Sequence, residues 1–259
     1  MTPELPLGAG VRVLAVHPSL PLFAIDKPAG ILSHPNRDGA QRNTLLDAPY
    51  NLADECYSLP HNSRLHLLNR LDSPTSGVLL ATIDNALANE IKKIFKSHCA
   101  ENITKIYYAV VKGSRFTPPN GIWRDRLTRR NHGGALRTQI GGAGAIPALT
   151  RYQCLASTTS PTALSLLRLS PETGRTHQLR VQSAAHFHPI IGDKTYGDFL
   201  LNRRLEKLPP SPALSAFNRL FLHAQSISIA FSWKNTPQSF TATSPLPQDF
   251  LAIFPTESL

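Results

Sequence analysis

The chain has 259 residues and is 41% hydrophobic, which is enough to bury a sizeable core. Its net charge of +10 and pI near 9.9 favour a polyanionic partner, either a nucleic acid or an acidic membrane surface. No apolar stretch approaches the roughly 18 to 20 residues of a membrane span, and the N-terminus lacks the basic and apolar regions of a secretory signal. These features predict a soluble intracellular protein.

The first predicted elements are strands over residues 11–16 and 22–25, which a His-Pro-Ser turn separates. An irregular stretch follows, in which one short helix is expected around residues 43–47. The apolar run over residues 65–71 ends at turn residues, and the next apolar run, residues 78–81, predicts a buried strand.

Asp84 can cap a helix that continues through residue 96. Its apolar stripe consists of Leu87, Ile91, Ile94 and Phe95, spaced as one helix face. Its three lysines, Lys92, Lys93 and Lys96, fall outside this stripe. A solvated helix face explains them better than a dedicated RNA contact does.

The second half of the chain mixes strands and helices. Residues 106–111 are apolar on both alternating faces, which predicts a central strand covered on both sides. Residues 164–169 predict another strand, residues 176–185 a helix, and residues 220–231 a late strand. This mixed order argues for an α+β or α/β sheet domain.

Residues 124–144 carry six basic side chains among several glycines and show almost no helical or strand period. We expect a mobile basic loop here. Flexible arginines suit contacts to RNA phosphates that need no fixed geometry, and they suit a solvated loop equally well. The six residues are Arg124, Arg126, Arg129, Arg130, His132 and Arg137.

The segment from residue 69 to residue 77 is the most informative, because it places Asp72 beside Arg70 on a tight turn. Ser, Pro, Thr and Gly form the turn, and apolar runs on both sides hold it. By itself an Asp before Ser-Pro is more often a turn cap than a catalytic group. Motifs elsewhere in the chain favour a catalytic role for Asp72 over a turn cap.

Five blocks in order resemble the motifs of the RluA-type RNA pseudouridine synthases, including the signature H-R-L-D-x-x-T-S-G. Together they span residues 24 to 224. They are A-I-D-K-P-A-G from residue 24, N-R-L-D-S-P-T-S-G from residue 69, K-I-Y-Y-A-V-V-K-G from residue 105, G-R-T-H-Q-L-R-V from residue 174 with I-I-G-D from residue 190, and L-H-A from residue 222. The resemblance implies an α+β pseudouridine synthase fold, with a mixed, largely antiparallel central sheet flanked by helices and an active-site cleft across the sheet.

The resemblance also implies a role for each of five residues. Asp72 matches the catalytic aspartate, and Arg180 the arginine that keeps this carboxylate charged by an ion pair. Tyr107 matches the tyrosine that stacks on the target base, and Leu222 an apolar wall of the uracil pocket. Arg70 matches the arginine that fills the space left in the RNA by the flipped base. Ordinary core packing is the competing explanation for Tyr107 and Leu222.

The implied reaction converts uridines of ribosomal or transfer RNA to pseudouridine, by base flipping and by cleaving and re-forming the glycosidic link. It oxidises nothing and adds no water overall, so no cofactor and no metal are expected. We predict a single catalytic domain over residues 1–259 with a motif-bearing core at about 11–232, no N-terminal S4-type domain, and recognition of RNA by the catalytic domain itself. We further expect a cytoplasmic monomer with no membrane association and no obligatory protein partner.

Two positions depart from the family pattern: residue 69 is Asn and residue 182 is Gln, where His is common. Asn69 can form hydrogen bonds but cannot carry the charge of an imidazole, so we expect activity to persist and any difference from the family to concern RNA recognition. Lys27, His177 and Gln178 are expected to support the site without touching the substrate.

Two rival functions were weighed. A metal-dependent hydrolase could use His186 and His188 with Asp193, although a His-x-His spacing is a weak signal. A catalytically weak or inactive synthase relative could act as an RNA-binding or assembly factor. Retention of Asp72, Tyr107 and Arg180 argues against this second alternative.

Overall fold

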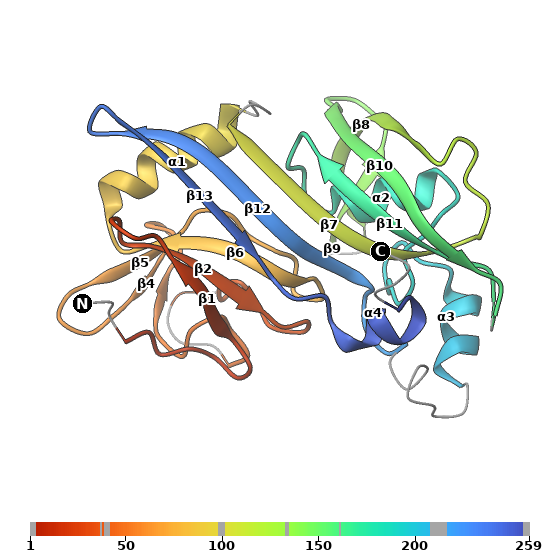
Figure 1. The fold of residues 1–259 in the computed structure, drawn as a ribbon, viewed down its shortest axis with the longest axis horizontal. Coiled ribbons are helices and arrows are strands. Elements are labelled where there is room, and N and C mark those ends of the chain that lie inside the picture. The colour runs from red at the N-terminus through yellow and green to blue at the C-terminus, as the bar shows by residue number, and fades with distance from the viewer. Residues whose placement is uncertain are drawn as a thin grey trace. The chain divides into compact units, whose positions relative to one another are not determined.

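The structure is a computed structural model that describes residues 4–36, 38, 42–97, 102–132, 135–160, 162–207 and 217–255. The chain forms two compact units. The first comprises Met1–Thr104 and Ala224–Pro245, and the second Lys105–His223 and Leu246–Leu259. Each unit is described separately below, with the labels of Figure 1.

The first unit is built on an antiparallel sheet in which β6 pairs with β2 on one side and with β5 on the other. All seven residues of β6 are buried, as its apolar sequence predicts for a strand covered on both faces. The strands are β1 (Arg12–Val16), β2 (Leu22–Lys27), β6 (Ser76–Thr82), β5 (Arg64–Leu67), β4 (Cys56–Ser58) and β3 (Tyr50–Asn51), paired in this order. The strands predicted at 11–16, 22–25 and 78–81 are confirmed.

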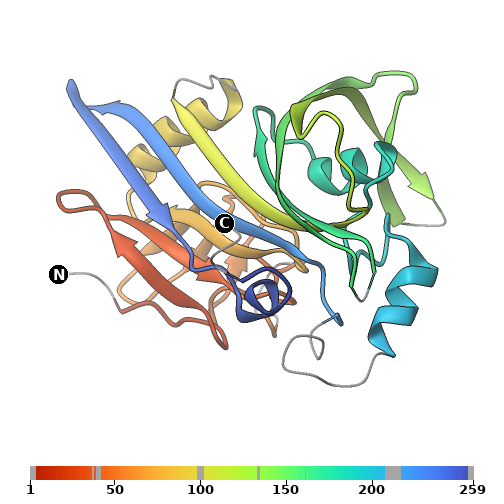
Figure 2. The same ribbon diagram turned by 45° about the vertical axis from the view of Figure 1, so that its right-hand side comes forward.

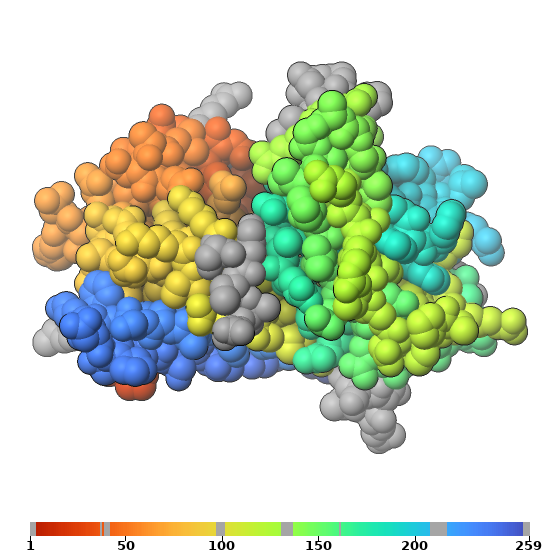
Figure 3. Space-filling view, turned by 90° about the horizontal axis from the view of Figure 1, so that it is seen from above, coloured from red at the N-terminus to blue at the C-terminus, as the bar shows by residue number. Residues whose placement is uncertain are grey.

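Helix α1 (Asn85–Ser97) contacts β5 and β6, and it shares a hydrophobic cluster with the hairpin of β12 (Leu222–Trp233) and β13 (Thr236–Thr243) (Figures 1 and 3). Its start is fixed by Asp84, whose Oδ1 accepts a hydrogen bond of 3.0 Å from the Leu87 amide. The buried face consists of Leu87, Ala88 and Ile91, which belong to one hydrophobic cluster with Leu80 of β6 and Ile229 of the hairpin. The helix predicted over 84–96 is therefore confirmed.

The helix predicted around residues 43–47 is wrong. Asn43 has a φ of 58°, which a right-handed helix does not allow. Thr44 instead forms an isolated parallel bridge with Leu32, and Leu46 an antiparallel bridge with Leu7. The buried Thr44 hydroxyl donates to the Leu46 carbonyl at 2.7 Å, so local side-chain bonding competes with the helix.

The second unit has a curved antiparallel sheet, with α2 (Gln178–Ala185) lying within its curve (Figure 2). Leu127, Ala148 and Val181 form a small core between the sheet and α2. The strands, in spatial order, are β7 (Ile103–Lys112), β11 (Leu164–Pro171), β10 (Ile146–Thr158), β8 (Asn120–His132) and β9 (Ala135–Ile140). The strands predicted over 106–111 and 164–169 are confirmed.

The mobile basic loop predicted over residues 124–144 is wrong, because most of it forms the hairpin of β8 and β9. Trp123 and Leu127 face inward and are buried, whereas Arg124 and Arg126 are exposed. The strand alternation is therefore real. Arginines occupy the outward-facing positions of the strand, so the sequence looks like a basic segment and hides the alternation of buried and exposed residues.

Short helices complete the second unit: α3 (Phe199–Glu206) and α4 (Gln248–Ile253), neither of which the sequence pattern predicts. Phe250 of α4 is fully buried and lies 5.2 Å from Phe221, measured between ring centroids. The predicted α+β class with a largely antiparallel sheet is confirmed by the observed elements. Within the described ranges, no helix is long and apolar enough to cross a membrane.

Candidate active site

Asp72 lies on the turn between β5 and β6 and is half-buried. Its carbonyl accepts a hydrogen bond of 3.0 Å from the Thr75 amide, which closes the turn. Gly77, where the turn enters β6, has a φ of 115°, and a Cβ there would lie 2.2 Å from the Ala224 carbonyl oxygen. Only glycine fits this position. The backbone that carries Asp72 is thus fixed at its downstream end.

Lys27 fixes the same turn from the other side. Its side chain is completely buried, and its ammonium donates to the carbonyls of Pro28 at 3.0 Å, Ile31 at 2.7 Å and Ser73 at 3.0 Å. Three donors matched with three carbonyls make a buried charge tolerable. These contacts tie residue 73 to the loop after β2, and the role of Lys27 toward an active site stays a prediction.

The residues just before Asp72 are held by side-chain hydrogen bonds to the backbone. The Ser33 hydroxyl donates to the Leu71 carbonyl at 2.8 Å and accepts from the Leu71 amide at 3.1 Å. Asn69 accepts a hydrogen bond of 2.8 Å from the Leu80 amide through its Oδ1. The Asn that replaces the usual His thus has a structural function, because it joins the start of the turn to β6.

Arg70 is exposed, and its guanidinium donates to His34 Nε2 at 2.9 Å. The Nδ1 atom of His34 lies 2.7 Å from the Pro35 carbonyl, so Nδ1 carries the proton and Nε2 is the acceptor. The imidazole also stacks on Tyr50, with ring centroids 4.9 Å apart and planes 15° apart. These contacts hold the exposed Arg70 against His34 at the surface of the first unit.

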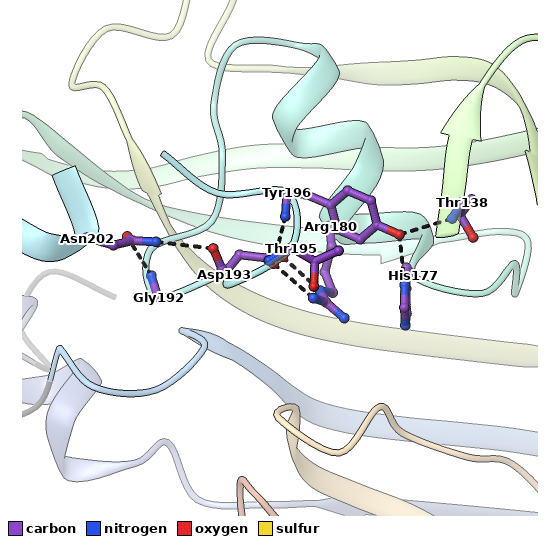
Figure 4. Close-up of polar contacts among 8 residues, drawn as sticks. All are labelled: Thr138, His177, Arg180, Gly192, Asp193, Thr195, Tyr196 and Asn202. Carbon is purple, nitrogen blue, oxygen red and sulfur yellow. Dashed lines mark hydrogen bonds and ion pairs between the residues drawn. The ribbon is translucent and has the colours of Figure 1, made fainter. Parts of the chain in front are cut away.

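Arg180 of α2 is the central charge in the second unit, where it forms a bidentate ion pair with Asp193 (Figure 4). Nε lies 2.7 Å from Oδ2 and Nη2 lies 2.8 Å from Oδ1, and the two side chains are only 5% and 1% exposed. Asp193 also accepts from the amides of Thr195 at 2.8 Å and Tyr196 at 3.0 Å. Burial alone would raise the pKa of Asp193, but Arg180 and these amides hold it below its usual value.

The turn that carries Asp193 is held by α3. Gly192 has a φ of 75°, and a Cβ there would lie 1.7 Å from the Arg219 carbonyl oxygen. Asn202 accepts from the Gly192 amide at 2.9 Å and donates to the Asp193 carbonyl at 3.2 Å. Sequence reasoning missed Asn202, because nothing in the pattern around it predicts α3.

Tyr196 connects Arg180 to the β8–β9 hairpin. The guanidinium lies 5.2 Å from the centroid of the Tyr196 ring. The Tyr196 hydroxyl accepts a hydrogen bond of 3.1 Å from the Thr138 amide of β9 and lies 2.9 Å from His177 Nδ1 (Figure 4). Sequence reasoning gave Tyr196 no role.

A chain of buried amides and hydroxyls fixes the orientation of α2. Gln178 donates to the Thr150 hydroxyl at 3.0 Å, and Thr150 donates to Gln182 Oε1 at 2.7 Å. Gln182 then donates to Asp125 Oδ2 at 2.7 Å. Gln182, which replaces a common His, is therefore fully used as a hydrogen-bonding group. These contacts give Gln178 a structural role in holding α2, and its supporting role toward an active site stays a prediction.

The five residues expected at the site fall in both units. Asp72 and Arg70 belong to the first, whereas Tyr107, Arg180 and Leu222 belong to the second. Tyr107 is half-buried in β7, opposite Leu169, and Leu222 is 3% exposed and part of the hydrophobic core. Their roles toward a substrate stay predictions.

The metal site considered for a hydrolase does not form in the described part of the chain. His186 lies 3.1 Å from Asp125 and stacks on Trp123. His188 Nδ1 is 3.0 Å from the Lys112 carbonyl, and Asp193 is paired with Arg180. The three candidate ligands therefore have separate structural partners.

Comparisons with known proteins show the family of the chain. A family model for RNA pseudouridylate synthases matches residues 21–185, which include Asp72, Tyr107 and Arg180. A tRNA pseudouridine synthase C of Haemophilus ducreyi is 34% identical over 246 residues, covering 90% of each chain. The enzyme of the same name in Pasteurella multocida is 31% identical over 243 residues, covering 89% of this chain and 90% of the relative.

Solved structures show the same fold. Human RNA pseudouridylate synthase domain containing 4 is 24% identical, with a TM-score of 0.63 over 92% of this chain and 90% of that one. Human RNA pseudouridylate synthase domain containing 1 is 23% identical, with a TM-score of 0.64 over 91% and 84%. The chain belongs to the RNA pseudouridylate synthase family, whose members are isomerases that act on RNA.

Proposed function

We propose that this protein converts a uridine of transfer RNA to pseudouridine, with Asp72 as the catalytic carboxylate. The observation that carries the proposal is the Asp72 turn, which buried Lys27 and the glycine-only position Gly77 fix on both sides. The choice of transfer RNA over ribosomal RNA rests on relatives that are named for transfer RNA and match nearly their whole length. The net charge of +10 suits either RNA.

The reaction breaks the bond between C1′ and N1, turns the uracil, and forms a bond between C1′ and C5. The proton on C5 is released to solvent and N1, freed from C1′, takes up a proton, so the product has the same composition as the substrate. An ionised Asp72 can act as a nucleophile at C1′ or as a base that removes a ribose proton. Both routes require a carboxylate in a fixed position, which the turn provides.

Arg180 supplies the charge that keeps Asp72 ionised in this proposal. Guanidinium is planar and carries five N–H donors, and its pair with Asp193 engages one edge of that plane. Asp193 thus fixes the orientation of Arg180 before RNA binds. A preorganised cation stabilises developing charge without further reorganisation, which is the largest effect in many enzymes.

The remaining assignments concern access to the target. A uridine within folded RNA is stacked, and extracting it costs a few kcal/mol. We assign Arg70 to the space vacated in the RNA, Tyr107 to stacking on the flipped base, and Leu222 to the apolar wall of the uracil pocket. The exposure of Arg70 and the partial exposure of Tyr107 support the first two assignments.

We further propose that residues 1–259 act as one catalytic domain, as a cytoplasmic monomer. Support comes from the motif blocks, which are distributed over both compact units, so that neither unit carries the full set. Size-exclusion chromatography with light scattering would test the monomer. A mass of two chains would contradict it.

The function is tested by tritium release. Transfer RNA and ribosomal RNA carrying tritium at uridine C5 are prepared from cells that lack this gene, then incubated with the wild-type protein or with Asp72→Ala. We expect release from transfer RNA by the wild type and none by the variant. No release from either RNA would contradict the activity and favour a non-catalytic RNA-binding relative. Release by Asp72→Ala would contradict only the residue assignment.

A further inference from the structure

Lys105 at the start of the second unit is a lysine with too few partners for its environment. Its ammonium donates to one group, the Thr173 carbonyl, at the long distance of 3.4 Å. Within the described ranges, no carboxylate pairs with it. Burial lowers the pKa of Lys105 to about 8, so the group is mainly protonated at pH 7.

Two other lysines of this protein show what is missing. Buried Lys27 satisfies its three donors with three backbone carbonyls. Lys112, on the same strand as Lys105, pairs with the Asp198 carboxylate at 2.7 Å. A desolvated ammonium with neither arrangement destabilises the fold, and such groups occur preferentially where a ligand completes them.

The position of Lys105 indicates which ligand. Lys105 and Tyr107 are two residues apart in β7, so their side chains leave the same face of the strand. The ammonium lies 3.7 Å from the position of a Cβ built on Gly174, at the turn that leads into α2 and Arg180. Lys105 therefore lies between Tyr107, the predicted base-stacking residue, and the loop that precedes α2, the helix of Arg180.

We propose that Lys105 binds a backbone phosphate of the RNA next to the target uridine. This inference rests on the proposed function, because it uses Tyr107 as the marker of the target nucleotide. Phosphate is the anionic group that every nucleotide offers, and its oxygens accept the hydrogen bonds that Lys105 lacks. A partly desolvated ammonium binds such an anion more strongly than a lysine in water does.

The first test measures how salt affects RNA binding. Affinity for unfractionated transfer RNA is measured between low and moderate salt for the wild type, Lys105→Met and the control Lys112→Met. Loss of one phosphate contact should make the slope of log K against log salt shallower by about 0.7 to 0.9. We expect this change for Lys105→Met only, with Lys105→Arg close to wild type. An unchanged slope for Lys105→Met would overturn the inference.

The second test separates a ligand-binding lysine from a structural one. Because the charge of Lys105 is partly desolvated and has one long hydrogen bond, Lys105→Met should raise the melting temperature in the absence of RNA while weakening RNA binding. A structural lysine would show a lower melting temperature, and that result would overturn the proposal. The binding slope reports on phosphate contact whether or not tritium is released. Failure of this inference is thus distinguishable from failure of the proposed function.

Discussion

The Asp72 turn and the Arg180 site are held in place by different means. Asp72 stands on a turn fixed through the backbone, by the carbonyls that Lys27 binds and by the tight fit of Gly77. Arg180 is fixed through a buried side-chain ion pair with Asp193, a residue thirteen positions away. The carboxylate of Asp72 is only half-buried and can be carried by a turn fixed through its backbone, whereas the buried cation of Arg180 requires a dedicated counter-ion.

The largest effect is expected from Asp193→Ala. It leaves the charge of Arg180 buried without its carboxylate, which should destabilise the protein by about 3 to 5 kcal/mol. Urea denaturation at pH 7 measures the loss. Asp54→Ala, which removes an exposed ion pair with Arg64, serves as the control and should cost no more than about 1 kcal/mol. A loss for Asp193→Ala as small as the control would contradict the account of the Arg180 site.

The pH dependence of the same variant sharpens this test. The pKa of Asp193 is lower in the folded protein than in the unfolded chain, so its contribution is present above the unfolded value, about 4. The contribution is lost as the pH falls through the folded value. The stability difference between wild type and Asp193→Ala should therefore shrink on acidification, and a difference that grows would contradict the assigned direction.

Lys27→Met tests how the Asp72 turn is held, as Asp193→Ala does for Arg180. The change leaves three carbonyls without their donor, which should cost about 2 to 3 kcal/mol and loosen the turn. Lys93→Met on the surface of α1 is the matched control and should change stability by less than about 0.5 kcal/mol. At a temperature where both variants are folded, single-turnover tritium release should fall for Lys27→Met alone. Equal rates would show that the hydrogen bonds of Lys27 do not position Asp72.

A smaller effect is expected from Tyr196→Phe, which removes the hydroxyl between Thr138 and His177 but keeps the ring beside Arg180. Loss of this hydrogen bond should cost about 1 kcal/mol. Tyr152→Phe is the control, because its hydroxyl forms only a long bond of 3.5 Å to Pro118. Thermal unfolding compares the two, and equal melting temperatures would mean that the hydroxyl does not anchor β9.

The sequence predicts the Asp72 turn well because its determinants are local. Turn residues follow Asp72 directly, and the capping residue Asp84 directly precedes its helix. The family resemblance added the distant positions Tyr107 and Arg180. The sequence does not predict which residues surround Tyr107 and Arg180, because those neighbours come from distant parts of the chain.

The errors have the same origin. The β8–β9 hairpin was missed because its inward residues, such as Trp123 and Leu127, are separated by arginines on the outer face. Asp193 was considered as a metal ligand, whereas it is the partner of Arg180. The two residues that hold the Asp193 turn, Asn202 and Tyr196, come from α3 and from a loop. No local sequence pattern links them to α2.

The most direct test compares two carboxylates in different environments. Asp72 is half-buried on a turn, whereas Asp193 is buried in an ion pair with Arg180. Asp72→Asn and Asp193→Asn each remove one negative charge, and single-turnover tritium release and melting temperature are measured for both. We predict that Asp72→Asn keeps the wild-type melting temperature and loses release by about a thousandfold or more. Asp193→Asn should lower the melting temperature and retain partial release. Release by Asp72→Asn at the wild-type rate would contradict the central claim that Asp72 performs the chemistry.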